Sequence, residues 1–360
     1  MKIEDLGYNE FFESNRNALK LADFSVARVT AEYRGAYKVK NEKGEFLAKV
    51  TGKRMFGAID REDYPAVGDW VAIEELGESR AVIRGVLPRS SIIKRRYGEN
   101  NKFAEKDEVQ IIATNIDVAF IVESVDRDYN LNRLERYFAI AESGGSKSAV
   151  MLNKIDLISK KELDEKLSNI KSRFPDMEVI PTSMVSSNGL EKLRQYIKQG
   201  KTHCFLGSSG VGKSSLINEL LGGNVIRTES ISSYSGRGRH TTTNRQMYFL
   251  ENGGIVIDNP GIREVGMTDV GKGIEVLFEE ITDLAKECKY ADCTHVHEPG
   301  CEVLVALKSG KLDRGKYSNY INLKKEVEYF ELNGSQKRNK ERQFGKFISK
   351  AQKEIKKYKP

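Results

Sequence analysis

The pattern of apolar and polar positions changes character along this chain of 360 residues. Between residues 23 and 96, short β-rich segments alternate with turns of glycine and charged residues. About five short strands without a strong helical pattern predict a small β-barrel. An OB-type barrel fits the size, and an SH3-like barrel would give a similar pattern. The β-rich segments are 24–33, 36–40, 45–51, 67–74 and 80–87.

From about residue 108 to 265, apolar β-type runs alternate with amphipathic helical stretches. Such alternation predicts a parallel sheet with helices on both of its faces. The expected strands are 116–123, 148–153, 178–182, 202–206 and 254–258, and the expected helices are 131–142, 161–173 and 189–198.

Beyond about residue 270 the pattern contains no evident strand. Helical spacing of apolar residues predicts helices at about 313–332 and 338–357. The chain is therefore predicted to be a multi-domain protein. We expect an OB-type β-barrel over 1–106, a central α/β P-loop domain over 107–268 and an α-helical, metal-binding domain over 269–360.

Residues 207–214 read GSSGVGKS and match the phosphate-binding pattern G-x-x-x-x-G-K-[ST]. Glycines let the backbone fold around phosphates, so that its N–H groups face the negative charge. Lys213 is expected to reach the β- and γ-phosphates as a catalytic residue, and Ser214 to bind Mg²⁺. The residues expected to contact the nucleotide here are Gly207, Ser208, Ser209, Gly210, Val211, Gly212, Lys213, Ser214 and Ser215.

The tetrapeptide NKID begins at Asn153, after an apolar run. In GTPases the aspartate of N-K-x-D accepts hydrogen bonds from guanine, and adenine offers no such pair of donors. Asp156 is therefore expected to select guanine, Asn153 to brace the phosphate-binding loop, and Lys154 to cover the base. Thr182 and Ser183 follow the next β-type run and are expected to contact the edge of the base.

Residues 258–261 read DNPG, a D-x-x-G pattern after an apolar run. Asp258 is expected to bind Mg²⁺, and the N–H of Gly261 to face the γ-phosphate. The preceding segment 230–243 is rich in Ser, Gly and Arg, as expected of a switch loop that the γ-phosphate and Mg²⁺ order. One threonine of this segment should complete the metal shell. The candidates are Thr241, Thr242 and Thr243, of which we assign Thr242.

Many GTPases place a glutamine just after D-x-x-G to orient the attacking water, but here that residue is Ile262. Either turnover is slow or another residue acts. His240 in the switch segment is the nearest candidate, and we expect it to position water once a partner orders the loop.

The guanine motif precedes the phosphate-binding loop by 54 residues, which reverses the usual order. A closed α/β domain whose ends lie close together can be permuted and keep the same site. We therefore predict a circularly permuted GTPase that binds GTP and GDP together with Mg²⁺.

The cysteines predict a metal site, because three of the four fall within residues 288–301. Three thiolates and one imidazole make a closed tetrahedral site of the kind that holds one structural Zn²⁺. Cys204 lies alone in a predicted strand and is expected in the core. The potential ligands are Cys288, Cys293, Cys301 and either His295 or His297.

The net charge of +7 is concentrated at the C-terminal end. Residues 335–360 hold eight Lys, two Arg and two Glu, which favours an anionic partner such as nucleic acid. Apolar runs such as 118–122 are too short to span a bilayer, and the N-terminus lacks the pattern of a secretory signal. We expect a cytoplasmic protein with no membrane contact.

These motifs in this order resemble the ribosome small-subunit-dependent GTPase A family of bacterial permuted GTPases. The resemblance covers nearly the whole chain, except 335–360, and implies an OB barrel, a GTPase domain and a zinc-bearing domain. It also implies that His295 is the fourth metal ligand and His240 the catalytic histidine. DNPG departs mildly from the family's usual DTPG or DSPG. The matching segments are PAVGDWV, LPRSS, QIIATNID, NKID, GSSGVGKSS, GRGRHTTT, DNPG and CTHVHEPGC.

The expected function is a monomeric GTP hydrolase that binds the small ribosomal subunit and its rRNA and assists late maturation. The subunit would stimulate hydrolysis, and hydrolysis would trigger release. The alternative is an RNA-binding GTP switch with negligible turnover that acts on another RNA partner, which Ile262 favours and His240 disfavours. Asp156 argues against an ATP-using enzyme, and a closed metal shell argues against zinc chemistry on RNA.

Overall fold

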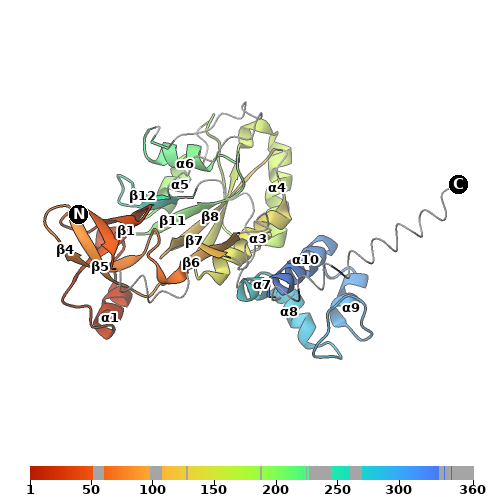
Figure 1. The fold of residues 1–360 in the computed structure, drawn as a ribbon. Coiled ribbons are helices and arrows are strands. Elements are labelled where there is room, and N and C mark those ends of the chain that lie inside the picture. The colour runs from red at the N-terminus through yellow and green to blue at the C-terminus, as the bar shows by residue number, and fades with distance from the viewer. Residues whose placement is uncertain are drawn as a thin grey trace.

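The computed structural model describes most of the chain as three consecutive parts (Figure 1). The N-terminal part is a β-barrel, and the middle part is an α/β domain. Helices form the C-terminal part, on the side away from the barrel. The described residues are 1–51, 61–97, 108–126, 129–186, 189–223, 225–226, 245–259, 270–331, 336 and 342.

Five strands form the N-terminal barrel and confirm the predicted one. They hydrogen-bond in the order β1-β2-β3-β5-β4, and β4 pairs back onto β1, which closes the sheet. Inward-pointing side chains such as Val29, Val39, Ala48 and Ile83 are fully buried. The strands are β1 (Ser25–Tyr33), β2 (Ala36–Lys40), β3 (Glu45–Val50), β4 (Trp70–Glu75) and β5 (Arg80–Val86).

The N-terminal segment packs against the barrel with aromatic and aliphatic side chains. Leu6 and Phe12 form one buried cluster with Trp70 of β4. The ring centroids of Phe12 and Trp70 lie 5.8 Å apart. The short helices here are η1 (Glu4–Leu6), α1 (Glu10–Ala18) and, before β4, η2 (Arg61–Asp63).

A buried arginine joins the barrel to the middle of the chain. Arg28 of β1 donates hydrogen bonds to the carbonyl oxygens of Leu6, Gly68 and Asn115. Burial lowers the pKa of Arg28 to about 10, so it stays charged at neutral pH. A buried charge must find such acceptors, so these bonds hold the three segments together.

A mostly parallel sheet forms the middle part, in the order β10-β9-β8-β11-β13-β12, with only β12 antiparallel. The helices α3 and α4 pack on one face and α5 and α6 on the other, as two separate cores show. The strands are β8 (Val118–Ser124), β9 (Lys147–Asn153), β10 (Val179–Pro181), β11 (Thr202–Leu206), β12 (Gln246–Phe249) and β13 (Ile255–Asp258). The helices are α3 (Leu131–Ser143), η3 (Ile155–Leu157), α4 (Lys160–Arg173), α5 (Leu190–Tyr196) and α6 (Lys213–Leu220).

Strand β12 connects the two sheets, because Gln246 of β12 pairs with Ala31 of β1. The barrel and the central sheet are therefore one hydrogen-bonded sheet of 11 strands. A separate antiparallel pair, β6 (Ile92–Tyr97) and β7 (Glu108–Thr114), links the two parts along the chain.

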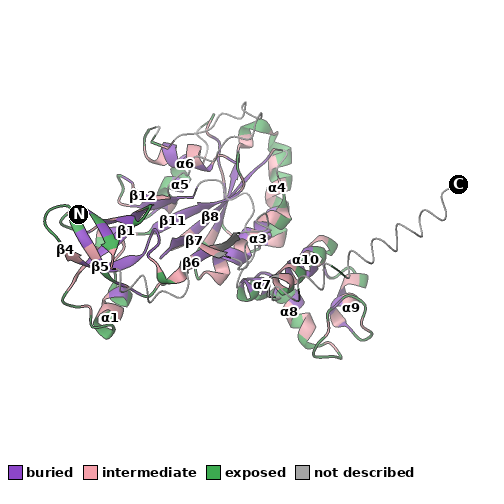
Figure 2. Ribbon diagram, in the orientation of Figure 1, coloured by how far each residue is buried: buried purple, intermediate pink, exposed green. Residues whose placement is uncertain are grey.

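All regular elements of the C-terminal part, within the described residues 270–331, are helices, and a turn-rich segment separates α8 from α9. Its first helix lies against α3 so closely that a Cβ atom on Gly273 would be 2.0 Å from the carbonyl oxygen of Ala139. Arg136 of α3 donates two hydrogen bonds to Glu326, at 2.7 and 2.6 Å. Figure 2 shows buried, intermediate and exposed residues on these helices, and Ile274, Leu277, Tyr320 and Leu323 are among the buried ones. The helices are α7 (Gly271–Leu277), α8 (Glu279–Lys286), α9 (Glu302–Lys308) and α10 (Arg314–Glu331).

The structure confirms the predicted three-part fold. Each expected strand and the helices expected at 131–142, 161–173, 189–198 and 313–332 are present with small shifts at their ends. The sequence pattern missed β6, β7, β12 and the short helices α7 to α9. The helix expected at 338–357 lies outside the described residues. No helix in the described ranges is long and apolar enough to cross a membrane.

Candidate nucleotide site and metal centre

The phosphate-binding loop connects the carboxyl end of β11 to the start of α6. Gly210 and Gly212 have φ angles of 85° and 99°, which side chains other than glycine rarely adopt. A Cβ atom on Gly207 would lie 2.3 Å from the carbonyl oxygen of Val122, and one on Gly212 would lie 2.3 Å from Nδ2 of Asn153. The loop is therefore folded tightly against β8 and the NKID segment.

Lys213 is the first residue of α6 and is buried, with 6% of the residue exposed. Its Nζ donates to the carbonyl oxygens of Gly207 and Ser208, both at 2.7 Å, which holds the charge inside the loop. Burial lowers the pKa of Lys213 to about 8, while the charge of Asp258 acts in the opposite direction. The site thus holds a positive charge in a desolvated place, where it acts strongly on an anion.

Asp258 lies at the end of β13 and is also buried. Burial raises the pKa of this carboxyl, and the charge of Lys213 lowers it. Among the described residues, its Oδ1 has no hydrogen-bond partner. A buried carboxylate oxygen without a donor is suited to a divalent cation or to its bound water.

The NKID segment lies beside the phosphate-binding loop, although the two are far apart in sequence. Asn153 donates from Nδ2 to the carbonyl oxygen of Val211 at 2.8 Å and accepts from the hydroxyl of Thr182 at 3.0 Å. The hydroxyl of Ser183 donates to Oδ1 of Asp156 at 2.5 Å. Thr182 and Ser183, which were predicted to contact the edge of the base, therefore hold Asn153 and Asp156 of the predicted guanine site.

Lys154 has a left-handed backbone conformation, with φ of 63°. Its Nζ donates to Oδ2 of Asp126 at 2.8 Å, so its side chain is held by the loop that follows β8. This contact fixes the lysine that was predicted to cover the base.

Several predicted site residues lie outside the described residues, so their roles stay predictions. These are Gly261, His240, Thr242 with its neighbours Thr241 and Thr243, and the position Ile262.

The sequence pattern gave no role to Arg133 of α3, which contacts the phosphate-binding loop. Its Nη1 donates to the hydroxyl of Ser208 at 2.9 Å and lies 3.7 Å from Oε1 of Glu123. The sequence offered no signal for this contact, since a polar residue near the start of a helix is ordinarily solvated. Only the neighbouring positions of β8 and β11 in the sheet bring α3 to the loop.

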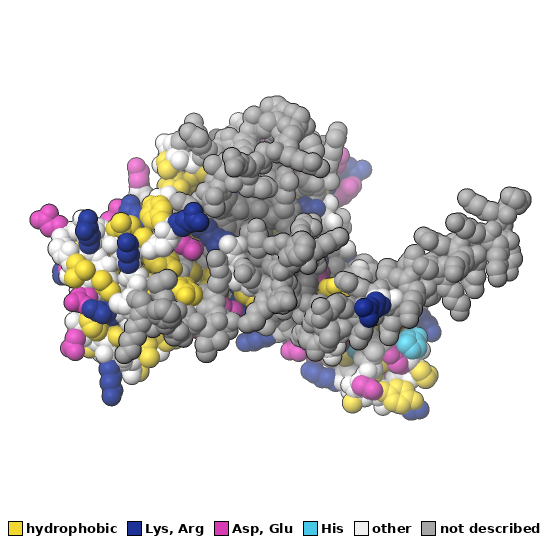
Figure 3. Space-filling view, in the orientation of Figure 1, with side chains coloured by type: hydrophobic (Ala, Val, Ile, Leu, Met, Phe, Trp, Pro, Cys, Tyr) yellow, Lys and Arg dark blue, Asp and Glu magenta, His cyan; other side chains and the backbone are white. Residues whose placement is uncertain are grey.

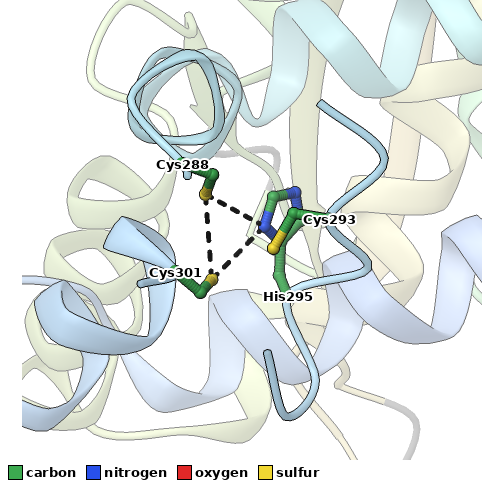
Figure 4. A group of neighbouring side chains, drawn as sticks. All are labelled: Cys288, Cys293, His295 and Cys301. Carbon is green, nitrogen blue, oxygen red and sulfur yellow. Dashed lines mark hydrogen bonds between the residues drawn. The ribbon is translucent and has the colours of Figure 1, made fainter. Parts of the chain in front are cut away.

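A second site lies in the C-terminal part, where three cysteines and one histidine converge (Figure 4). The ligand atoms of Cys288, Cys293, His295 and Cys301 all lie within 4.8 Å of one another. Sγ of Cys288 is 3.8 Å from Sγ of Cys301, and Nδ1 of His295 is 3.6 and 3.5 Å from these two sulfurs. This group can hold a metal ion.

The histidine of the cluster is His295, which is 3% exposed, whereas His297 is exposed and outside the group. The hydroxyl of Tyr317 in α10 donates to the carbonyl oxygen of His295 at 2.7 Å. A packed helix therefore fixes the histidine that the residues alone left undecided. Cys204 is fully buried in β11, as expected.

Glu298 organises the loop that carries the ligands. Its carboxylate accepts hydrogen bonds from the backbone N–H groups of Thr294, Val296 and His297, at 3.2, 3.1 and 3.2 Å. The Thr294 hydroxyl also donates to it, and these bonds hold the pKa of Glu298 well below its usual range. An ionised carboxylate thus shapes the turn between Cys293 and Cys301.

The fold and the nucleotide site together define a class of protein. The central part of the sheet, in the order β10-β9-β8-β11-β13-β12, carries the N-K-x-D segment, the phosphate-binding loop and the start of D-x-x-G in permuted chain order. This is a circularly permuted P-loop GTPase. The family model for the RsgA GTPase matches residues 86–268, and the chain belongs to that family.

Curated relatives match almost the full length of the chain. A protein of Bacteroides thetaiotaomicron named small ribosomal subunit biogenesis GTPase RsgA 1 is 36% identical and covers 96% of each chain. A protein of Lactiplantibacillus plantarum named small ribosomal subunit biogenesis GTPase RsgA 2 is 40% identical over 86% of each chain.

Two solved structures have a similar fold. The crystal structure of YjeQ from Thermotoga maritima superposes with a TM-score of 0.60 at 25% identity, over 83% of this chain and 96% of that one. The structure of YloQ, described as a circularly permuted GTPase, has the same fold, with a TM-score of 0.60 at 20% identity over 86% and 96% of the two chains.

Proposed function

We propose that this protein hydrolyses GTP on the small ribosomal subunit and assists the late maturation of that subunit. The observation that carries the proposal is the meeting of Asn153, Lys213 and Asp258 around one permuted nucleotide site. The names of the curated relatives support the choice of partner. The subunit stimulates hydrolysis in this proposal, and hydrolysis releases the protein.

Within the nucleotide site, we propose that the phosphate-binding loop and Lys213 bind the β- and γ-phosphates. Asp156 reads guanine, and its hydrogen bond from Ser183 keeps the carboxylate in place for that task. Ser214, Asp258 and a threonine of the switch segment, which we assign as Thr242, would hold Mg²⁺. The bound ion would neutralise charge on the phosphates. The oxygen Oδ1 of Asp258, which has no hydrogen-bond partner among the described residues, fits such an ion.

The attacking water needs a residue to orient it, and we propose His240 for this role, with Gly261 facing the γ-phosphate. Ile262 cannot replace the glutamine that serves many GTPases. In this proposal turnover is therefore slow until the subunit brings His240 to the attacking water.

We propose that Zn²⁺ occupies the cluster of three cysteines and His295. In a tetrahedral site with Zn–S bonds of ~2.3 Å, neighbouring sulfurs lie ~3.8 Å apart. The Sγ atoms of Cys288 and Cys301 are 3.8 Å apart. Four protein ligands leave no open position, so the ion supports the fold and takes no part in hydrolysis.

The division into a barrel over 1–106, a GTPase domain over 107–268 and a zinc-bearing domain over 269–360 is also proposed. The barrel and the basic segment 335–360 supply contacts to rRNA, because barrels of this kind bind nucleic acid and lysine attracts phosphate. We propose a monomer in the cytoplasm.

The testing experiment measures GTP turnover with and without purified small ribosomal subunits, with ATP as the control nucleotide. The proposal predicts a large, GTP-selective stimulation. His240→Ala should then lower stimulated turnover and leave GTP affinity unchanged. Equal turnover with ATP, or stimulated turnover that His240→Ala does not change, would contradict the corresponding part of the proposal.

A second candidate is a GTP-dependent switch with negligible turnover that acts on another RNA partner. Ile262 favours it, since the chain lacks a glutamine at the usual position. Tight GTP binding without stimulation by the small subunit would support this candidate.

A further inference from the structure

The start of helix α3 lies beside the phosphate-binding loop. Strand β8 pairs with β11 over Ile121 and Leu206, so the segments that follow the two strands leave the sheet side by side. Asn130 caps α3 and accepts hydrogen bonds from the N–H groups of Asn132 and Arg133. The cap fixes the first turn of the helix, and Arg133 belongs to that turn.

Arg133 has two partners at this place. Its Nη1 donates to the hydroxyl of Ser208 at 2.9 Å and lies 3.7 Å from Oε1 of Glu123. The side chain of Arg133 is 28% exposed and that of Glu123 is 0% exposed. The guanidinium is therefore held between a loop residue and a buried carboxylate.

Ser208 transmits this contact to the phosphate-binding lysine. The hydroxyl of Ser208 accepts from Arg133, and its carbonyl oxygen accepts from Nζ of Lys213 at 2.7 Å. One loop residue is thus in contact with both cations. Ser208 is therefore one of two loop residues whose carbonyl oxygens hold the ammonium group of Lys213, the other being Gly207.

Arg133 also compensates the charge of Glu123. This carboxylate is buried at the end of β8 and accepts from the N–H of Asn130 at 3.1 Å. A buried negative charge close to a triphosphate site repels the ligand, because Coulomb forces are strong where water is excluded. Arg133 compensates that charge at 3.7 Å.

We propose that Arg133 is a positioning residue for GTP, which acts on the phosphates through Ser208 and by compensating Glu123. The inference rests on the proposed function. It adds to the nucleotide site a residue of α3 that lies outside the GTPase motifs. Because GTP carries more negative charge than GDP, loss of Arg133 weakens GTP binding more than GDP binding. The ratio of the two affinities is therefore the diagnostic quantity.

The test compares full-length Arg133→Gln, Arg133→Lys and Ser208→Ala with the wild-type protein. Affinities for GTP and GDP, and kcat and KM with small ribosomal subunits, are measured for each. We expect Arg133→Gln to lower kcat/KM about tenfold and to lower the GTP-to-GDP affinity ratio. Arg133→Lys should restore most of the ratio, because it returns the charge, but not kcat, because lysine lacks the planar fork.

Ser208→Ala keeps the test decisive if Arg133→Gln does not fold. It removes only a hydroxyl, and it should lower kcat while the GTP-to-GDP ratio stays near the wild-type value. In the double variant, the loss in kcat should be smaller than the combined losses of the single variants, because both interrupt one contact.

Arg194→Gln is the matched control, since Arg194 of α5 also pairs with a glutamate, Glu219, at 3.0 Å and does so at the surface. It should leave all constants unchanged. A wild-type affinity ratio and kcat in Arg133→Gln would overturn the inference. Absence of stimulated turnover in the wild-type protein would instead count against the proposed function.

Discussion

The ammonium group of Lys213 is buried, so water does not solvate its charge. Burial places its pKa near 8 in the nucleotide-free protein, and its partners there are two carbonyl oxygens. Anionic phosphates favour the protonated form, so the pKa rises when the nucleotide binds.

This shift gives the nucleotide affinity a pH dependence. Above pH 8 the free protein loses the Lys213 proton and must regain it to bind, so the affinity for GDP falls by up to about tenfold per pH unit. Fluorescence titrations between pH 7 and pH 9 check the slope. Lys213→Arg is the control, because arginine stays charged throughout this range. An equal slope in the two proteins would contradict the assignment.

His203 is a buried titratable residue like Lys213, but it is not part of the predicted nucleotide site. It lies in β11, 1% exposed, with its ring stacked on Phe120 at 5.4 Å. Burial lowers the pKa of His203 to about 4.

Acid should therefore weaken the central sheet. Between pH 6.5 and pH 4 the unfolded chain binds a proton at His203 that the folded chain does not bind. The free energy of unfolding thus falls as the pH falls, by at most about 3 kcal/mol. Hydrogen exchange of the β11 amides at pH 7 and pH 5 measures the loss. His203→Phe keeps the stacking and should remove most of this dependence; if it does not, another group is responsible.

At the scale of single elements, the contact between α7 and α3 depends on one glycine. A Cβ atom at Gly273 would lie 2.0 Å from the carbonyl oxygen of Ala139 and 2.6 Å from the hydroxyl oxygen of Ser143. The N–H of Gly273 also donates to that hydroxyl, at 2.7 Å. The helix is therefore seated against α3 through its backbone.

Gly273→Ala should force α7 away from α3 and lower the stability of the C-terminal part by about 1–3 kcal/mol. Thermal unfolding and proteolysis of the C-terminal part measure the change. Gly271→Ala is the matched control in the same helix, because a Cβ atom there would meet no atom within 4 Å. Equal stability of the two variants would mean that the close packing is absent in solution.

The elements that the sequence predicted are those with a strong local pattern. Strands such as β8 are continuous apolar runs, and α4 has a serine cap with Glu162 in a capping box. Strand β12 was missed because its residues, QMYF, are few and show no clear alternation. Its partners β13 and β1 define it, and such partners are not visible in a local pattern.

The candidate sites likewise contain residues that the sequence predicted and residues that only the fold revealed. Motifs located Lys213, Asp156 and the cysteines because their chemistry requires fixed residue types at fixed spacing. Arg133 and Glu298 were missed, since each acts through a contact that the tertiary fold creates. The choice between His295 and His297 also needed the fold, which buries one of them beside Tyr317.

At the scale of the whole molecule, the metal-binding cluster is separate from the nucleotide site. Figure 3 shows Lys and Arg side chains over the visible face of the barrel and near the C-terminal helices. The metal cluster lies in the C-terminal part and shares no residue with the nucleotide site.

If the cluster holds Zn²⁺ as proposed, removal of the ion should lower the stability of the C-terminal part and leave nucleotide binding intact. Chelation, or Cys288→Ser, should expose α8 and α9 to proteolysis, because the cluster ties together the segments between them. Affinity for GDP should change less than about twofold, since none of the four cluster residues contacts the described residues of the nucleotide site. Metal analysis and nucleotide titration check this. Cys204→Ala is the control and should keep the metal; loss of nucleotide binding on chelation would contradict the separation.

The pairing of β12 with β1 has a practical consequence for anyone who dissects this chain. If the barrel is cut away, β12 becomes the edge of the remaining sheet, and Gln246 loses its backbone pairing with Ala31. An uncovered edge strand with apolar residues invites pairing between molecules. A truncated GTPase fragment would therefore tend to self-associate, and aggregation of such a fragment would say nothing about the intact protein.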